Sequence, residues 1–295
     1  MLGHYSCFCL PATNHHHHPR KQDGTAQTVT YLLVLDSLNF CFWPNETWEY
    51  DNLARALKDA IVRTPGAFEP ARLARLELDD FKGWFKGELD AAAKSGKGPE
   101  GYLPHMEERY RLVREVGQVL CDKFGGSSAS MIRQAGGSAA ALVDIVTSSF
   151  PGFRDSTVHN GEQVFFYKRA QIFVADVWGA FRGEGLGGFN DMEKLTMFAD
   201  YRVPQLLHFH KVMRYSEELE RRIMGHEVIR SGSAEEIEIR AATIVAVDTL
   251  RTRLAKAGFE LFAVEIDWIL WQAGEALVLG KQPISPHHRT LTIFY

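Results

Sequence analysis

The stretch Leu195-Thr-Met-Phe-Ala-Asp-Tyr-Arg-Val-Pro204 lies between two apolar helical patterns and decides how they are joined. Proline can begin the second helix, because the first turn of a helix does not need its missing N–H. Val203 precedes this proline and is therefore expected to be extended. The elbow between the two helices should hold Asp200, Tyr201 and Arg202 and carry them into a cavity.

Asp200 has two interpretations at this point. It can cap the helix that begins at Pro204, with Arg202 as an ion-pair partner on the surface, since aspartate is common at helix N-termini. Alternatively, its carboxylate is presented to a pocket where it takes part in chemistry. The spacing of these residues alone does not decide between the two.

The composition is that of a globular protein with a small-molecule partner. Hydrophobic residues make up 45% and charged residues 24% of the 295 residues, which is enough to bury a sizeable core. The formal net charge of -4 predicts no binding to duplex nucleic acid. The sequence has no run of about 18 apolar residues, so no membrane partner is expected. The oligomeric state is not determined, and a monomer is the working expectation.

The cysteines and histidines give no sign of a disulfide framework or a metal site. Cys7, Cys9, Cys41 and Cys121 form no CxxC motif, so a reducing, cytoplasmic location is expected. The run of histidines at residues 15–18 has polar flanks and is interpreted as a flexible loop. We therefore expect no metal and no cofactor.

The apolar residues recur with helical spacing along most of the chain. This pattern predicts a mainly α fold with little β structure, in one compact helical body over residues 28–295. Residues 1–27 have no periodicity and are predicted to be poorly ordered. Residues 29–43 are almost continuously apolar, and their length favours a buried helix. The other predicted helices span residues 48–64, 70–78, 106–124, 138–148, 164–181, 191–199, 204–222, 234–257 and 261–279. The glycine-dense residues 183–188 follow a helix and are interpreted as a flexible loop.

One predicted helix carries charged residues among aromatic ones. Lys168 and Asp176 lie on the same face of it, two turns apart. Burying both would be costly unless each met a partner or a ligand. In the alternative interpretation, Lys168 and its neighbour Arg169 extend their charged ends to solvent.

Polar residues also interrupt three other apolar runs. Asp36 and Asn39 stand beside Phe40 and Trp43, and such a mixture of aromatic faces and polar groups suits a planar heterocycle. An aromatic core with one satisfied amide is the simpler alternative. Asp248 and Asp267 lie within apolar helical segments. Several buried acids in one small protein would each need compensation, which favours a functional site.

Familiar catalytic motifs are missing from the sequence. It has no G-x-S-x-G elbow, no Walker loop, no G-x-G-x-x-G after a strand and no H-E-x-x-H. Serine hydrolysis, nucleoside triphosphate chemistry, Rossmann redox chemistry and zincin proteolysis are therefore disfavoured.

Four runs carry a joint resemblance to a known family. They are Tyr31-Leu-Leu-Val-Leu-Asp-Ser-Leu-Asn-Phe-Cys-Phe-Trp-Pro44, Tyr167-Lys-Arg-Ala-Gln-Ile-Phe-Val-Ala-Asp176, Leu195-Thr-Met-Phe-Ala-Asp-Tyr-Arg-Val-Pro-Gln205 and the segment from His288 to Tyr295. In this order they resemble the queuosine salvage protein family, the queuosine 5'-phosphate N-glycosylase/hydrolases. The resemblance implies a mainly helical fold related to helix-hairpin-helix DNA glycosylases. It also implies hydrolysis of queuosine 5'-monophosphate to queuine, a step of nucleotide metabolism that serves tRNA modification, with Asp200 as the catalytic carboxylate.

The implied reaction gives the polar residues provisional roles. Cleavage of a ribosyl C–N bond develops positive charge on the sugar, which a carboxylate at Asp200 would stabilise while orienting water. Queuine is a 7-deazaguanine, so the N7 atom that ordinary purine glycosylases protonate is a carbon here. Asp267 would meet the amino edge of the base or the cationic side-chain amine. Lys168 and Arg169 are the candidates for the 5'-phosphate, with Arg202 in reserve. The other residues expected to contact the substrate are Asn39, Phe40, Trp43, Asp176, Phe198, Tyr201 and Asp248.

Two other functions stay open on the sequence alone. A DNA-repair glycosylase would need a basic face, which the net charge of -4 disfavours. A non-catalytic binding module for a modified nucleobase would fit the same aromatic and acidic residues.

Overall fold

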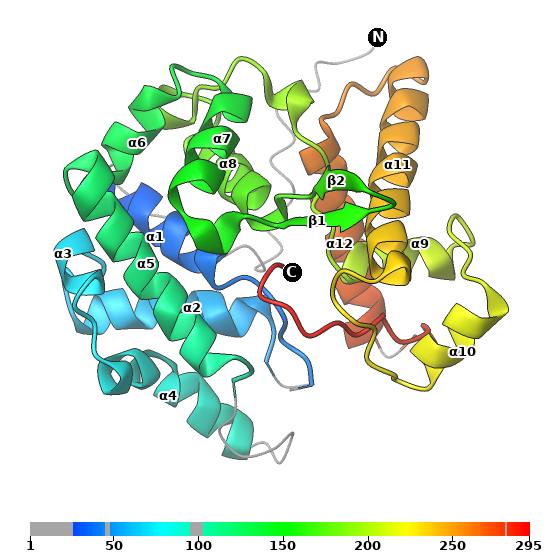
Figure 1. Ribbon diagram of the computed structural model, residues 1–295, viewed down its shortest axis with the longest axis horizontal. Helices are drawn as coiled ribbons and strands as arrows, with labels where there is room; N and C mark the ends of the chain where they lie inside the picture. Colours follow the sequence, from blue (N-terminus) through cyan, green and yellow to red (C-terminus); the bar gives the residue numbers. More distant parts are fainter. Residues whose placement is uncertain (1–25, 45–47, 95–102, 281) are drawn as a thin grey trace, which may run out of the picture.

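A computed structural model describes residues 26–44, 48–94, 103–280 and 282–295, and these residues form twelve α-helices and one β-hairpin (Figure 1). The helices are α1 (Ala26–Ser37), α2 (Tyr50–Arg63), α3 (Pro70–Leu73), α4 (Leu78–Lys94), α5 (Met106–Phe124), α6 (Ser128–Gln134), α7 (Ala139–Ser149), α8 (Lys168–Ala180), α9 (Arg202–Phe209), α10 (Glu217–Met224), α11 (Ala234–Lys256) and α12 (Ala263–Leu279). The hairpin pairs β1 (Ser156–His159) with β2 (Glu162–Phe165) in antiparallel register. The prediction of a mainly α fold is confirmed, and the predicted relation to helix-hairpin-helix glycosylases stays a prediction. Residues 1–25, which include the histidine run, lie outside the described residues.

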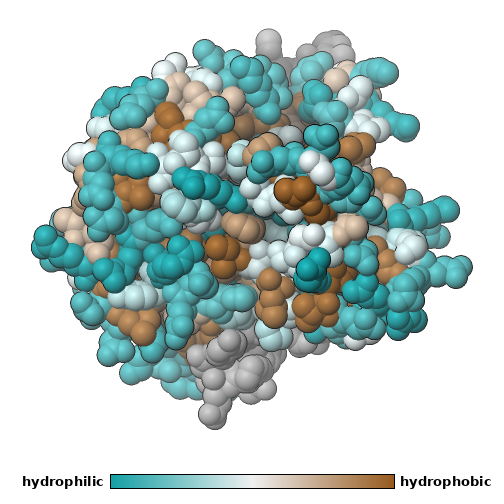
Figure 2. Space-filling view, viewed as in Figure 1, coloured by the Kyte–Doolittle hydropathy of each residue, from teal (hydrophilic) through white to brown (hydrophobic). Residues whose placement is uncertain are grey.

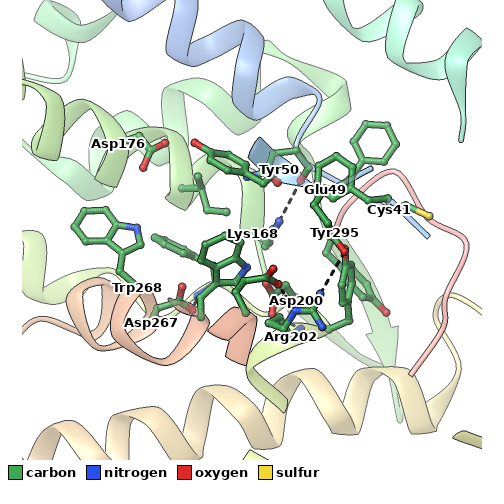
Figure 3. A pocket seen from close by; sticks show the side chains of 18 residues that line it. Cys41, Glu49, Tyr50, Lys168, Asp176, Asp200, Arg202, Asp267, Trp268 and Tyr295 are labelled. Carbon is green, nitrogen blue, oxygen red and sulfur yellow. Dashed lines mark hydrogen bonds and ion pairs between the residues drawn. The ribbon is translucent and has the colours of Figure 1, made fainter. Parts of the chain in front are cut away.

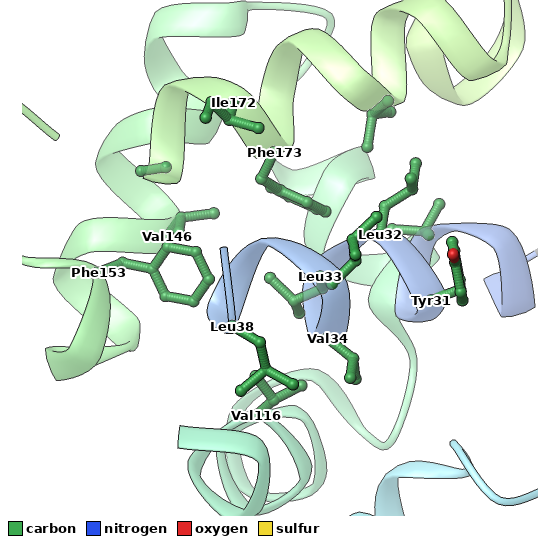
Figure 4. Packing of buried hydrophobic residues seen from close by; sticks show 14 of the residues in the cluster. Tyr31, Leu32, Leu33, Val34, Leu38, Val116, Val146, Phe153, Ile172 and Phe173 are labelled. Carbon is green, nitrogen blue, oxygen red and sulfur yellow. The ribbon is translucent and has the colours of Figure 1, made fainter. Parts of the chain in front are cut away.

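Helix α1 lies at the centre of the first half of the chain. Its residues Val29 to Leu35 are almost completely buried on every side, as expected for a helix that is apolar all round. It packs against α5, α6 and α8 (Figure 4). Phe173 of α8 and Leu33 of α1 belong to the same buried cluster. The helix begins at Ala26, two residues before the expected start of the domain.

The chain leaves the helical conformation after Ser37, although the apolar pattern predicted a helix as far as residue 43. The buried carbonyl groups of Leu38, Phe40 and Cys41 accept hydrogen bonds from the guanidinium of Arg109 on α5. A buried carbonyl outside a helix needs such a partner. Arg109 therefore makes an irregular segment possible here, and this segment lines the pocket described below.

The second half of the chain gathers α9 to α12 on the other side of the molecule (Figure 1). Helix α12 packs against both α9 and α11. A second apolar cluster, which includes Met197, Val203 and Ile266, stabilises this half. The C-terminal segment crosses between the two sides, where the main-chain N–H of Cys41 donates to the carbonyl of Tyr295 over 3.0 Å. The two halves therefore meet along residues 38–42, residues 196–202 and the end of the chain.

The predicted helix over residues 191–199 is wrong. Only Met192–Lys194 forms a 3-10 turn, and the chain then runs without regular structure to Asp200. Side chains from distant elements replace the missing helical hydrogen bonds. Gln171 accepts from the N–H of Thr196, and Asp267 accepts from the N–H of Phe198.

Several other boundaries also differ from the sequence pattern. The predicted helix over residues 204–222 is divided into α9 and α10, and Val203 is helical rather than extended. The predicted helix over residues 164–181 begins only at Lys168, because residues 164 and 165 belong to β2. Asn160 and Gly161 adopt positive φ angles of 51° and 84° in the turn of the hairpin, a conformation for which this residue pair is suited. The glycine-dense residues 183–188 contain a 3-10 turn at Gly185–Gly187.

The face of the molecule drawn in Figure 2 is largely polar, with small separate groups of apolar residues. Among the described residues, no helix has the length and apolar character needed to cross a membrane.

Candidate active site

A pocket opens where the two halves of the molecule meet (Figure 3). Ligand sites typically combine apolar walls with a few polar groups, and this pocket does so. The lining residues are Asn39, Phe40, Cys41, Phe42, Glu49, Tyr50, Lys168, Ile172, Asp176, Phe198, Asp200, Tyr201, Arg202, Asp267, Trp268, Trp271, Glu275 and Tyr295. All the predicted site residues except Trp43, Arg169 and Asp248 are among them.

Asp200 lies two residues before the start of α9 and lines the pocket. Its Oδ1 accepts hydrogen bonds from the main-chain N–H groups of Arg202 and Val203, over 2.9 and 3.1 Å. These are free N–H groups of the first helical turn, so the carboxylate caps the helix. Both interpretations of the sequence are therefore partly right: one oxygen of Asp200 caps α9, and the residue also lines the pocket.

Burial and the neighbouring groups shift the pKa of Asp200 in opposite directions. Burial raises its pKa above the ordinary value, while the positive charge of Lys168 and the two N–H groups at the start of α9 lower it. The N-terminal end of a helix also favours a negative charge. Asp200 is therefore a carboxyl group in a partly dry site, and Lys168 and the N–H groups at the start of α9 stabilise its ionised form.

Lys168 begins α8 and points into the pocket toward Asp200 (Figure 3). The side chain is only 4% exposed, so the alternative that it extends to solvent is wrong. Its Nζ donates to the carbonyl of Asn39 over 3.1 Å. Burial lowers the pKa of the ammonium group, and the nearby charge of Asp200 raises it. The charges of Lys168 and Asp200 therefore stabilise each other across the pocket.

Asp267 is a second buried carboxyl beside Asp200. It comes from α12, and its Oδ1 accepts the main-chain N–H of Phe198 over 3.0 Å. Burial raises the pKa of Asp267 well above its ordinary value, and the negative charge of Asp200 raises it further. The prediction that Asp267 is buried within an apolar helix is confirmed.

Arg202 lies between two carboxylates at the edge of the pocket. Its Nε is 2.5 Å from Glu275 Oε1, and its Nη2 is 3.4 Å from Glu49 Oε1. Its Nη1 also donates to Gln205 over 2.7 Å. The side chain is buried, so the alternative of a surface ion pair between Arg202 and Asp200 is wrong. Burial raises the pKa of Glu49 to about 7, although the charge of Arg202 opposes this shift.

Aromatic side chains form much of the remaining wall. Tyr50 from α2 meets Trp271 from α12 edge to face, with 6.1 Å between the ring centroids. Trp268, one turn earlier on α12, and Phe198 also line the pocket. Such faces can enclose a planar ring system, while the carboxyl groups supply hydrogen-bond acceptors.

Three predicted site residues lie outside this pocket. The Arg169 guanidinium donates to the carbonyls of Ser37 and Gly152, so it supports the backbone and does not reach solvent either. Trp43 packs beside the Phe40 cluster, with the Arg289 guanidinium 5.7 Å from its ring centroid. The prediction that Asp248 is buried is wrong. Its side chain is 61% exposed on α11 and pairs with Arg251, because it falls on the outer face of that helix.

Sequence reasoning missed several lining residues. Trp268 and Trp271 stand close to Asp267 in the same apolar helix, so the helical spacing contained a signal that pointed to them. Glu49 and Glu275 gave no such signal, because they look like ordinary surface acids until Arg202 brings them together. Tyr295 belonged to a run that was recognised, but its place on the wall depends on the path of the whole C-terminal segment.

No three His, Cys, Asp or Glu side chains are grouped as a metal ion would require, over the part of the chain that the structure describes. The expectation of no metal and no cofactor stays a prediction.

The fold and the pocket together define the class of protein: a mainly helical protein with a pocket that acidic and aromatic side chains line. A profile of the family described as "Queuosine salvage protein" matches residues 17–295. The chain therefore belongs to the queuosine salvage protein family, and the resemblance seen in the four sequence runs is confirmed.

Individual relatives agree with this assignment. The chain is 51% identical over 271 residues to a queuosine 5'-phosphate N-glycosylase/hydrolase of Dictyostelium discoideum, a match that covers 92% of this chain and 79% of the relative. A protein of the same name from Sphaerobacter thermophilus is 45% identical over 92% of this chain and 83% of its own length. The corresponding protein of Mus musculus is 32% identical over 95% of this chain and 85% of its own length.

Proposed function

We propose that this protein hydrolyses the N-glycosidic bond of queuosine 5'-monophosphate and releases queuine for salvage into tRNA modification. The observation that carries this proposal is the position of Asp200. A carboxylate whose Oδ1 is fixed by two main-chain N–H groups lines a pocket beside a buried lysine. The relatives at 51% and 45% identity are named for this activity.

Asp200 is suited to stabilise the cation that forms on the sugar. When the bond from C1' to the base breaks, C1' and the ring oxygen share a positive charge. A fixed carboxylate lowers the energy of that state without having to reorganise. The same carboxylate can orient a water molecule and accept its proton as the water attacks C1'. Lys168 supports the role, because its charge favours the ionised form of Asp200.

The excess of acidic groups in the pocket fits this substrate better than an ordinary nucleotide. Five carboxyl groups line the pocket (Glu49, Asp176, Asp200, Asp267 and Glu275), against two cationic side chains, Lys168 and Arg202. Queuosine carries an amine on its side chain that is protonated at neutral pH. We therefore place this ammonium group among the acids, away from Lys168.

The 5'-phosphate needs a positive partner. Arg169 is outside the pocket, and Arg202 is already bonded to Glu49 and Glu275, so the structure leaves Lys168 as the first candidate among the predicted cations. We predict a preference for the monophosphate over the free nucleoside. Equal catalytic efficiency on the two compounds would refute the phosphate contact.

We propose that the substrate is a small nucleotide and that the reaction takes place in the cytoplasm. Cys41 and Cys121, the cysteines within the described residues, are free thiols, which is compatible with a reducing compartment. The absence of duplex nucleic acid as a partner and the monomeric state stay predictions.

Incubation with queuosine 5'-monophosphate tests the proposal directly. Chromatography should show queuine and ribose 5-phosphate appearing in equal amounts. Binding of the nucleotide without any product would favour the non-catalytic binding module. Release of a base from damaged duplex DNA, with a gel shift at moderate salt, would favour the DNA glycosylase instead.

A further inference from the structure

Asp200 and Asp267 are two carboxyl groups in one pocket with unequal support from the backbone. Asp200 Oδ1 accepts two N–H groups at the start of α9, and Lys168 lies opposite. Asp267 Oδ1 accepts a single N–H, that of Phe198. Among the described residues, no main-chain N–H donates to the other oxygen of Asp267, and the residue lines the pocket. Asp267 is 4% exposed, so water does little to stabilise a charge on it.

Two neighbouring carboxyl groups in a dry site do not both ionise easily. Each negative charge raises the pKa of the other, and the pair keeps one proton to a higher pH than an isolated aspartate would. A proton shared by such a pair is more stable on the carboxyl with the weaker support. Burial and the charge of Asp200 raise the pKa of Asp267, and the N–H of Phe198 and the charge of Lys168 oppose this rise. The two groups are therefore unequally suited to hold a proton, as two carboxyl groups with opposite tasks must be.

We infer that Asp267 is a second catalytic residue, a general acid that delivers its proton to the departing base while Asp200 stays ionised. This inference rests on the proposed function and adds to it the origin of the leaving-group proton. A 7-deazaguanine has no N7 to accept a proton, so its departure depends on an acid that reaches another edge of the base. Asp267 lines the same pocket as Asp200, and it accepts the main-chain N–H of Phe198, the residue two positions before Asp200.

The proposed step balances in atoms and charge. The bond between C1' and the base nitrogen breaks, and its electron pair stays on the base. The proton of Asp267 passes to the base, so queuine leaves with an uncharged ring system, and Asp267 becomes a carboxylate. Water adds its oxygen to C1' and gives a proton to Asp200, which forms ribose 5-phosphate. Transfer of that proton from Asp200 to Asp267 restores the starting state.

A change of leaving group separates this role from a structural one. Asp267→Asn keeps an oxygen that can accept the N–H of Phe198, but it has no acidic proton. We expect kcat on queuosine 5'-monophosphate to fall by about 100-fold or more, within the range of general acid catalysis. On 4-nitrophenyl β-ribofuranoside 5'-phosphate, whose leaving group needs no proton, the variant should stay within about threefold of the wild type. Asp200→Asn should lose activity on both substrates. Asp144→Asn, on the exposed face of α7, is the matched control and should lose it on neither.

The pH dependence gives a second test that does not need the artificial substrate. The wild-type kcat/KM should decline on the alkaline side as Asp267 loses its proton, and Asp267→Asn should lack that decline. An equal loss of rate on both substrates, or an unchanged alkaline limb in the variant, would overturn the inference. Absence of queuine release by the wild-type protein would instead overturn the proposed function itself, so the two failures are distinguishable.

Discussion

Replacement of Arg240 by leucine tests how the fold holds the segment before Asp200. The Arg240 guanidinium lies in the interior between the rings of Phe166 and Tyr295, 4.0 and 4.2 Å from their centroids. It donates to both oxygens of Asp155, over 2.9 and 2.5 Å. Its Nε donates to the carbonyl of Ala199 over 3.0 Å. One side chain of α11 therefore fixes the residue that precedes Asp200.

Asp155 extends this connection to the other side of the pocket. Its Oδ2 accepts the main-chain N–H of Lys168 over 3.1 Å, at the start of α8. The side chains of Arg240 and Asp155 are only 3% and 4% exposed. Leucine at position 240 would leave the Asp155 carboxylate buried without its cation. Breaking a buried pair in this way costs about 3–5 kcal/mol, much more than the loss of a surface pair.

Urea unfolding followed by tryptophan fluorescence measures this cost. For a chain of this length, such a loss corresponds to a fall in Tm of roughly 6–10 °C. Arg251→Leu is the matched control on the same helix. The Arg251 side chain is 37% exposed and pairs with exposed Asp248, so its loss should cost at most about 1 kcal/mol.

The same variant should also lose activity. Without the hydrogen bond from Arg240, the carbonyl of Ala199 is free to move, and Asp200 moves with it. We expect kcat to fall at a temperature where the variant is still fully folded. A loss of stability below about 1 kcal/mol, equal to that of Arg251→Leu, would refute the argument that this buried pair organises the site.

Three further predictions concern charge and packing. Lys168→Met should move the acid limb of the kcat/KM profile to higher pH, because the lysine charge lowers the pKa of Asp200, which acts in its ionised form. Lys168→Arg keeps the charge and should move the limb less. An unmoved limb in Lys168→Met would contradict the electrostatic effect of Lys168 on Asp200. Glu49 has a folded-state pKa of about 7 against an ordinary 4.5, so its protonation stabilises the fold at low pH, and this stability is lost as the pH rises through 7. The free energy of unfolding of Glu49→Gln, measured relative to wild type in urea, should therefore increase between pH 5 and pH 8, and a constant difference would contradict the shift. Phe173→Ala should lower the free energy of unfolding by about 3–5 kcal/mol, because the ring is fully buried. Phe259→Ala, at a residue that is 59% exposed, should lower it by less than about 0.5 kcal/mol. Equal losses of stability in the two variants would contradict the core described.

The helices that the sequence predicted best are those with local stop and start signals. Residues 106–124 form α5 with the predicted bounds, and Gly125 ends it in a left-handed conformation. Helix α11 starts where Ser233 caps it through the N–H of Glu236. Such signals lie within a few residues of the helix end, so a sequence contains all the information they need.

The predicted elements that proved wrong depend on partners far along the chain. The irregular segment after Ser37 is held by Arg109, which is about seventy positions away. The non-helical approach to Asp200 is held by Gln171 and Asp267. Apolar periodicity does not reveal such contacts, because it reports only which face of a helix would be buried.

The residues of the candidate site were likewise only partly predictable from the sequence. Asp200, Lys168 and Asp267 attracted notice because a charge within an apolar run needs an explanation, and all three line the pocket. The same reasoning failed for Asp248, because this residue lies on the exposed face of α11. It could not separate Lys168 from Arg169 either, because adjacent residues on a helix point in different directions: one lines the pocket, and the other supports the backbone.

The central claim is that the carboxylate of Asp200 carries the hydrolysis. The most direct measurement is single-turnover release of queuine from queuosine 5'-monophosphate by wild-type protein and by Asp200→Asn, with the affinity for the nucleotide measured on both. The amide keeps an oxygen for the two N–H groups of α9 but lacks the charge, so binding should persist within about tenfold while release slows by a factor of about 1,000 or more. Release at the wild-type rate by Asp200→Asn would contradict the account.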